Sequence, residues 1–138
     1  RDKYIGIRGC MELARNEKLK TVKQLVLPGN QIFDEGLEAL TESPYLINLE
    51  LLNVNQNEIG DDGAIAIANT ENFPKLKDLS MFGNVIGDIG AKAFADSLQS
   101  KKYIKLDLYK NQYTREGYKA LTESENLKNC EELEVYRE

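Results

Sequence analysis

The stretch Leu76-Lys77-Asp78-Leu79-Ser80-Met81-Phe82-Gly83-Asn84-Val85-Ile86 decides the fold, because its pattern recurs along the chain. Its asparagine returns at one constant interval, together with the apolar residues five and three positions before it. The asparagines in this phase are Asn30, Asn57, Asn84 and Asn111. A period of roughly 20 to 50 residues is typical of solenoids, so we predict one small unit in tandem copies.

Within one unit, the apolar spacing changes from a strand pattern to a helix pattern. Leu79 and Met81 alternate with more polar neighbours, as in a short strand with one buried face. The later segment Gly90-Ala91-Lys92-Ala93-Phe94-Ala95 has helical spacing, which predicts a helix of roughly two to three turns. The residues expected to cap the helix of their own repeat are Asp34, Asp61, Asp88 and Thr114.

Alternating strands and helices predict an α/β fold, a right-handed superhelix of βα units. The strands should form one parallel sheet on the concave face. The helices should lie on the convex face, because they need more width than the ~4.8 Å between strands. Over residues 1–138 we predict a single solenoid of about five 27-residue repeats. A fragment of a longer chain is an alternative for the domain organisation.

The recurring asparagines are predicted to be structural. Where the chain leaves each strand, backbone N–H and C=O groups face the interior without partners, and an inward amide can satisfy both kinds. Glycines also recur in the helical segments, as Gly36, Gly63, Gly90 and Gly117. We expect them to allow close packing between a helix and the neighbouring coil.

The net charge limits the possible binding partners, and the cysteines indicate the cellular compartment. The formal net charge of −5 argues against a nucleic-acid or anionic-membrane surface. Cys10 and Cys130 are separated by more than four repeats, hence by at least roughly 20 Å, so we predict no disulfide between them. Two unpaired thiols fit a reducing compartment, and we expect a cytoplasmic protein.

The frame Leu-x-x-Leu-x-Leu-x-x-Asn-x-Ile, present from Leu76 to Ile86, resembles the leucine-rich repeat family. The helical segments that begin at Gly63 and Gly90 look like its ribonuclease-inhibitor-like subclass. They are most similar to the Gly-Ala-x-Ala-Leu-Ala repeats of the GALA effectors of bacterial pathogens. This resemblance implies protein–protein recognition on the concave sheet surface. It also implies a location in the host cytosol if the chain is a translocated effector.

The repeat register predicts which side chains share the outer face of the sheet. Two residues before each asparagine phase stand Pro28, Asn55, Phe82, Tyr109 and Tyr136. Three consecutive aromatic residues in one row predict a binding surface, because exposed aromatic side chains are favoured interface anchors. The alternative is that these rings pack on one another. The charged residues predicted to complete the partner-binding surface are Asp78, Lys105, Asp107, Lys110, Glu132 and Glu134.

The sequence favours a non-enzymatic binding module, for example a bacterial effector or its regulator. The chain contains no histidine, and paired carboxylates such as Asp61 and Asp62 stand at a helix start, where capping explains them. We therefore expect no catalytic, cofactor or metal site. Two alternatives stay open. The chain could inhibit a partner enzyme by covering its active site, or it could be a structural middle segment of a longer solenoid.

Overall fold

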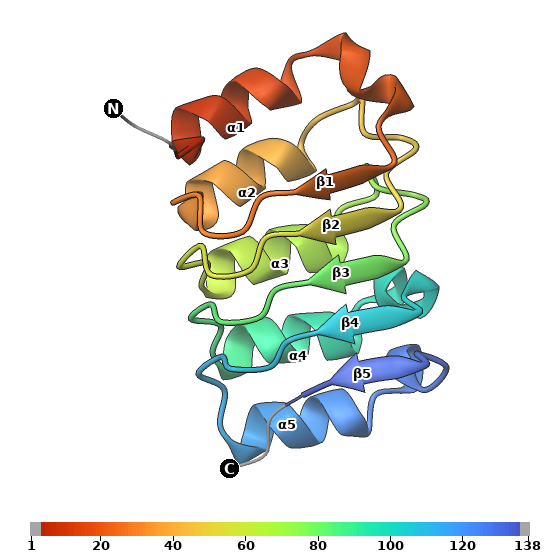
Figure 1. Cartoon of the computed structure of the whole chain (residues 1–138). Helices are drawn as coiled ribbons and strands as arrows, with labels where there is room; N and C mark the ends of the chain where they lie inside the picture. The colour runs from red at the N-terminus through yellow and green to blue at the C-terminus, as the bar shows by residue number, and fades with distance from the viewer. Residues whose placement is uncertain (1–3, 136–138) are drawn as a thin grey trace.

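The computed structural model describes residues 4–135, which form five coils stacked in one direction (Figure 1). The strands are β1 (Gln24–Val26), β2 (Leu51–Asn53), β3 (Asp78–Ser80), β4 (Lys105–Asp107) and β5 (Glu132–Glu134). The α-helices are α1 (Gly6–Ala14), α2 (Phe33–Thr41), α3 (Asp61–Asn69), α4 (Asp88–Asp96) and α5 (Arg115–Thr122). Three 3₁₀ helices, η1 (Glu17–Thr21), η2 (Leu98–Lys102) and η3 (Glu125–Leu127), precede β1, β4 and β5.

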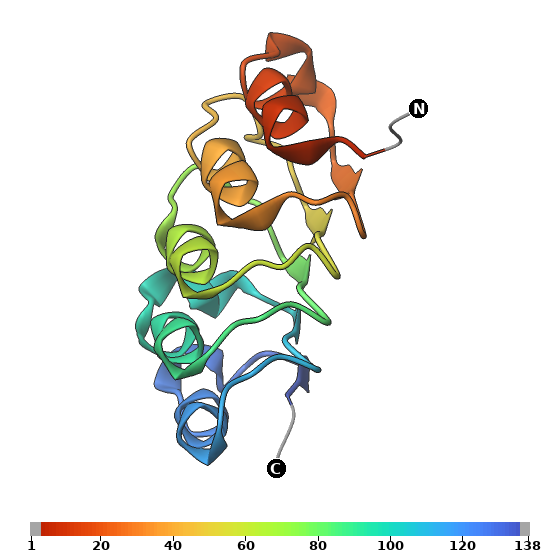
Figure 2. The same ribbon diagram turned by 90° about the vertical axis from the view of Figure 1, so that its left-hand side faces the viewer.

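The strands form one parallel sheet in the order β1-β2-β3-β4-β5, as the repeat predicts. Each residue pairs with its equivalent in the next repeat, so that Leu52 lies beside Leu25 and Leu79. Seen from the side, the sheet follows the inner face of the stack and the helices follow its outer face (Figure 2). The predicted α/β superhelix, with its concave sheet and convex helices, is confirmed.

The core is a column between the sheet and the helices. The central residue of each inner strand, such as Leu52 or Leu79, is fully buried, while its two strand neighbours are half-buried. From the helices, Leu40, Ile67 and Phe94 fill the other side of the column. Each coil therefore buries apolar surface against the next coil, and burial of such side chains stabilises the stack.

The recurring asparagines join neighbouring coils and form what we call the asparagine ladder. Asn84 Oδ1 accepts the backbone N–H groups of Asn57 (2.8 Å) and Ile59 (3.0 Å) in the preceding coil. Its Nδ2 donates to the carbonyl oxygens of Val54 (3.2 Å) and Met81 (3.0 Å). Asn57 and Asn111 make the equivalent contacts one coil away on either side. The predicted structural role is confirmed.

The expected capping by aspartate is wrong in one respect: each aspartate caps the helix of the following repeat. Asp61 Oδ1 accepts N–H groups from Gly87 and Gly90, both at 2.8 Å, at the start of α4. Asp34 and Asp88 act in the same way on the next helices. The reason is the stacking of helix N-termini, which brings unpaired N–H groups beside the carboxylate of the coil before. Of the four residues predicted to cap, Thr114 caps its own helix, by accepting the N–H of Glu116.

The helix glycines leave the space that these carboxylates occupy. A Cβ atom added at Gly63 would lie 2.7 Å from Asp34 Oδ1, and one at Gly90 would lie 2.8 Å from Asp61 Oδ1. At Gly117 the same atom would meet Asp88 Oδ1 at 2.6 Å. A side chain at any of these positions would displace the carboxylate that caps the helix. The predicted role of the glycines in close packing is confirmed.

A third set of contacts, the hydroxyl ladder, was not predicted. The side chains of Ser43, Thr70, Ser97 and Ser124 recur with the period of the asparagines, at the other side of the coil. Ser97 Oγ donates to the carbonyl oxygen of Ala68 in the preceding helix (2.6 Å) and accepts the N–H of Gln99 (3.0 Å). The others bond in the same way. These hydroxyls satisfy helix C-terminal carbonyls and start the segments that lead into the strands.

Replacing Asn84 by Ala should lower the free energy of unfolding by about 3 kcal/mol, because it removes four buried hydrogen bonds to backbone groups of two coils. Asn30→Ala is the matched control. Asn30 is half-buried, and within residues 4–135 its side chain bonds the N–H of Ile5 and the carbonyl of Pro28, so about 1 kcal/mol is expected. Urea unfolding followed by circular dichroism measures both. Equal losses would contradict the ladder as the source of the difference.

Acid should weaken the Asp88 contact. Hydrogen bonds from the Thr114 hydroxyl and from the backbone of Thr114 and Gly117 lower the pKa of Asp88. A lowered pKa in the folded state stabilises the fold above the ordinary carboxyl pKa of about 4, and this stability is lost as the pH falls through the folded-state pKa. Asp88→Asn should therefore be less stable than wild type at pH 7, with the difference shrinking below pH 4. Urea midpoints between pH 2.5 and 7 test this, and a constant difference would refute it.

Candidate functional site

The outer face of the sheet carries side chains in straight rows, because the strand register has no slip. Asp78 pairs with Leu51 on one side and with Lys105 on the other, and Lys105 pairs with Glu132. The ladder of backbone bonds continues beyond the strands, where Gln56 N donates to Phe82 O (2.9 Å). The rows predicted from the sequence therefore exist from β1 to β5. Tyr136, the last residue of the predicted aromatic row, lies outside the described residues.

Phe82 and Tyr109 form a stacked pair where β3 and β4 end. Their ring centroids are 6.2 Å apart and their planes differ by 20°. Both side chains are half-buried, so the rings cover part of each other and still present a shared surface to solvent. The stacking was the alternative to binding in the sequence analysis. Here the two are compatible, because a stacked pair is a broad, rigid apolar surface.

The backbone turns sharply directly after this aromatic pair. The residues that follow the aromatic row have left-handed φ values: Gly29 (61°), Gln56 (57°), Gly83 (73°) and Lys110 (61°). Lysine rarely adopts this conformation, which costs of order 1 kcal/mol or more where no glycine is present. The turn brings Lys110 Nζ to 5.9 Å from the ring centroid of Tyr109, within range of a cation–π contact. Lys110 thus belongs to the surface around the aromatic pair.

Two polar side chains fix the backbone of the aromatic residues. Asn55 Oδ1 accepts the N–H of Phe82 (2.8 Å) and the hydroxyl of Ser80 (2.7 Å). Asp107 Oδ1 accepts the N–H of Tyr109 (3.0 Å). Asp107 was predicted as a partner contact, and the structure also gives it this positioning role. Asn55, the row neighbour of Phe82, supports the ring instead of extending the aromatic surface.

The remaining predicted charges lie on β3, β4 and β5, before the aromatic pair on the same sheet face. Lys105 Nζ lies 3.8 Å from Glu132 Oε1, an exposed ion pair of the kind that contributes little to stability. Asp78 is half-buried on β3, and Glu134 is exposed on β5. Asp78 and Asp107 belong to different rows, with Lys105 and Ser80 as their respective neighbours. The sheet therefore does not bring these two carboxylates together as a facing pair.

Two surface depressions lie against α1, lined by residues such as Met11 and Arg15, and neither Phe82 nor Tyr109 lines them. No group of three or more His, Cys, Asp or Glu side chains that could hold a metal ion occurs within residues 4–135. Over the same residues, none of the helices has the length and apolar character needed to span a membrane.

A family model described as Leucine Rich repeat matches residues 18–40, 45–68 and 74–95, half of the chain. The chain belongs to the leucine-rich repeat family. The three matched segments each run from the approach to a strand into the following helix, so the family unit coincides with the structural coil. Leucine-rich repeat domains generally mediate protein–protein interaction. No curated protein sequence matches this chain.

Solved structures support the leucine-rich repeat fold. The chain is similar to the tropomodulin C-terminal domain of Caenorhabditis elegans, with a TM-score of 0.69 and 14% sequence identity. The similarity covers 96% of this chain and 82% of that one. At this level of identity the likeness concerns the fold alone.

The two cysteines of this leucine-rich repeat chain lie at the ends of the stack. Cys10 is fully buried in α1, and burial raises the pKa of its thiol to about 11. Cys130 is half-buried before β5, at the other end of the stack, and burial also raises the pKa of its thiol. Both cysteines are free thiols. Their placement gives them core positions at opposite ends of the solenoid.

The two thiols should therefore differ in reactivity. With a disulfide reagent at pH 8, Cys130 should react in the native protein, whereas Cys10 should react only as fast as the protein opens, because its sulfur has no solvent contact. Absorbance of the released thiolate gives both rates, and Cys130→Ser identifies the fast phase. A single fast phase that accounts for two thiols would contradict the burial of Cys10.

Proposed function

We propose that this leucine-rich repeat chain is a non-enzymatic binding module that holds a partner protein on its concave sheet surface. The observation that carries the proposal is the stacked, half-exposed pair of Phe82 and Tyr109. Aromatic rings that are already ordered lose little conformational entropy on binding, and such residues dominate the affinity of protein interfaces. A broad, shallow face of this kind matches a protein surface better than a small ligand, which prefers an enclosed pocket.

The charges around the pair give the partner a preferred chemistry. Asp78, Asp107, Glu132 and Glu134 would accept hydrogen bonds from basic or hydroxyl-bearing groups placed around an apolar contact. Lys105 and Lys110 complete the rim. Exposed charges of this kind influence the rate and selectivity of association more than its final affinity.

We further propose that the repeats belong to the ribonuclease-inhibitor-like subclass and are related to the GALA type. Buried small residues at the start of the helices, such as Gly63, Ala64, Gly90 and Ala91, support this assignment. A bacterial effector or effector regulator that acts in the cytosol is the role that this subclass suggests. An inhibitor that covers the active site of a partner enzyme is the alternative.

Removal of both rings tests the proposed site. Phe82→Ala with Tyr109→Ala should weaken the affinity for the partner, obtained by affinity capture from the native cell, by at least about 10-fold. The control is Ile89→Ala with Leu98→Ala, which removes two side chains that are 64% and 73% exposed on other elements. This control should leave the affinity unchanged. Isothermal calorimetry measures both, with circular dichroism to confirm folding.

An unchanged affinity for the folded double ring variant would reject the concave aromatic site. If the captured partner is an enzyme, its activity with and without this chain separates inhibition from docking. A loss of activity that depends on Phe82 and Tyr109 would favour the inhibitor.

A further inference from the structure

A second surface gathers exposed lysines that form no ion pair. Four ion pairs occur among residues 4–135: Lys77 with Glu50, Lys92 with Glu116, Lys105 with Glu132, and Lys128 with Glu125. Several lysines of the first three repeats lie outside these pairs. Lys18, Lys20, Lys23 and Lys75 are all exposed, and within the described residues none of them has a carboxylate oxygen within the 4.0 Å that defines a pair. We call these four residues the basic edge.

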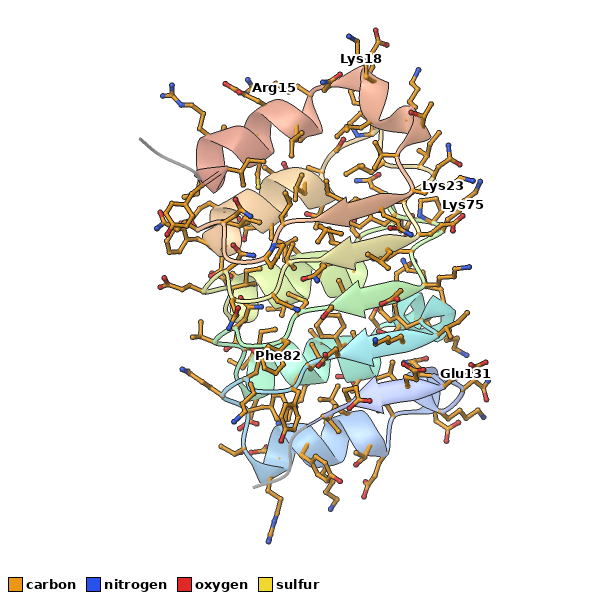
Figure 3. The ribbon with its side chains drawn as sticks, viewed as in Figure 1. Arg15, Lys18, Lys23, Lys75, Phe82 and Glu131 are labelled. Atoms are coloured by element: carbon orange, nitrogen blue, oxygen red, sulfur yellow. The ribbon has the colours of Figure 1, made fainter. Side chains whose placement is uncertain are left out.

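The members of the basic edge come from different repeats but lie on one side of the sheet. Lys18 and Lys20 lie in η1, Lys23 precedes β1, and Lys75 precedes β3. Figure 3 places Lys23 and Lys75 on the side where the strands begin, with Lys18 above them and Phe82 toward the side where the strands end. Strands spaced by ~4.8 Å place the first and third repeats only about 10 Å apart.

The second repeat links the members of the basic edge. Asn48 Nδ2 donates to the carbonyl oxygen of Lys20 (2.6 Å), and Asn48 Oδ1 accepts from Lys75 Nζ (2.7 Å). Tyr45 lies below the same surface, with its ring centroid 6.0 Å from Lys20 Nζ. Asn48 thus links the ammonium group of Lys75 to the backbone of Lys20. This link holds the charge of Lys75 on the basic edge.

We infer that the basic edge binds an acidic segment of a partner protein, an inference that rests on the proposed protein-binding function and specifies part of the partner. Ammonium groups without a carboxylate partner among residues 4–135 are available to Asp or Glu side chains, and Tyr45 offers an adjacent apolar contact. Each pair would be exposed and individually weak, so several must act together.

The distribution of charge favours an acidic protein segment over a nucleic acid or a membrane. The basic edge spans only three repeats, whereas nucleic acids and anionic bilayers present long uniform negative surfaces. The chain carries a net charge of −5. Glu35 and Glu38 in α2, Glu42 at its C-terminal cap and Asp62 in α3 form an acidic group. These residues would repel a polyanion that extended beyond the basic edge.

The same edge of the sheet changes sign along the solenoid. Glu131 precedes β5 and Glu132 is its first residue, and Figure 3 places Glu131 on the side where the strands begin, which also carries Lys23 and Lys75. A partner that crosses the sheet would therefore meet positive charge at the first repeats and negative charge at the last. Such a gradient would fix the direction in which an elongated partner lies, because the reverse orientation would place like charges together.

A short peptide tests this inference without the unidentified partner. The probe is a fluorescein-labelled peptide of eight glutamates, titrated into the full chain at about 50 mM salt, where screening is moderate. Lys23→Glu with Lys75→Glu should weaken binding by at least about 10-fold. The matched control is Arg115→Glu with Lys119→Glu on α5, which makes the same change in net charge at exposed residues outside the four ion pairs. It should change binding by less than about 2-fold.

Equal losses in the two charge variants would show an effect of net charge alone and would overturn the basic edge. Tighter binding of a single-stranded oligonucleotide of the same charge would overturn the choice of an acidic protein segment. The variant Phe82→Ala with Tyr109→Ala should bind the glutamate peptide like wild type. If it does, and yet keeps full affinity for the natural partner, the aromatic site fails while the basic edge stands.

Discussion

The coils of this solenoid leave polar backbone groups at their turns, and side chains of neighbouring coils satisfy many of these groups. Asn84, Asp61 and Ser97 do so at three different points of the coil, each through a hydrogen bond to another repeat. The apolar column between sheet and helices supplies most of the driving force, because it removes hydrophobic surface from water. The asparagine ladder, the aspartate caps and the hydroxyl ladder, together the three ladders, determine how the coils are aligned. A buried polar group left without a partner lowers the stability of the fold.

The residues that hold the coils together are different from the residues that form the variable surface. Positions that repeat in every coil are occupied in forming contacts between coils. Positions that vary from coil to coil, such as Phe82, Tyr109 and Lys23, lie on the sheet face and its edge. The scaffold therefore holds variable side chains at fixed spacings, and recognition depends on which side chains are placed there.

Much of the fold followed from the sequence, because one period governs strand, helix and register together. The rows that contain Asp78 and Lys105 could be written down before the structure, since their spacing is that of the asparagines. The capping by Asp61 could not be predicted from the sequence. Local patterns do not show that its partner Gly90 stands 29 residues away in the next helix. The hydroxyl ladder was visible as a spacing but had no recognised role. The stacking of Phe82 on Tyr109 depends on side-chain orientation, which a row assignment does not supply.

The alignment of the three ladders determines which changes in length the chain can tolerate. An insertion of one residue within a coil would shift its asparagine, aspartate and hydroxyl positions against both neighbours, so that a single change breaks contacts on two sides. An insertion of one whole repeat would add a coil whose donors and acceptors already match those around it. Chains of this design can therefore grow or shrink by duplication of whole coils, while small insertions are confined to places that none of the ladders crosses.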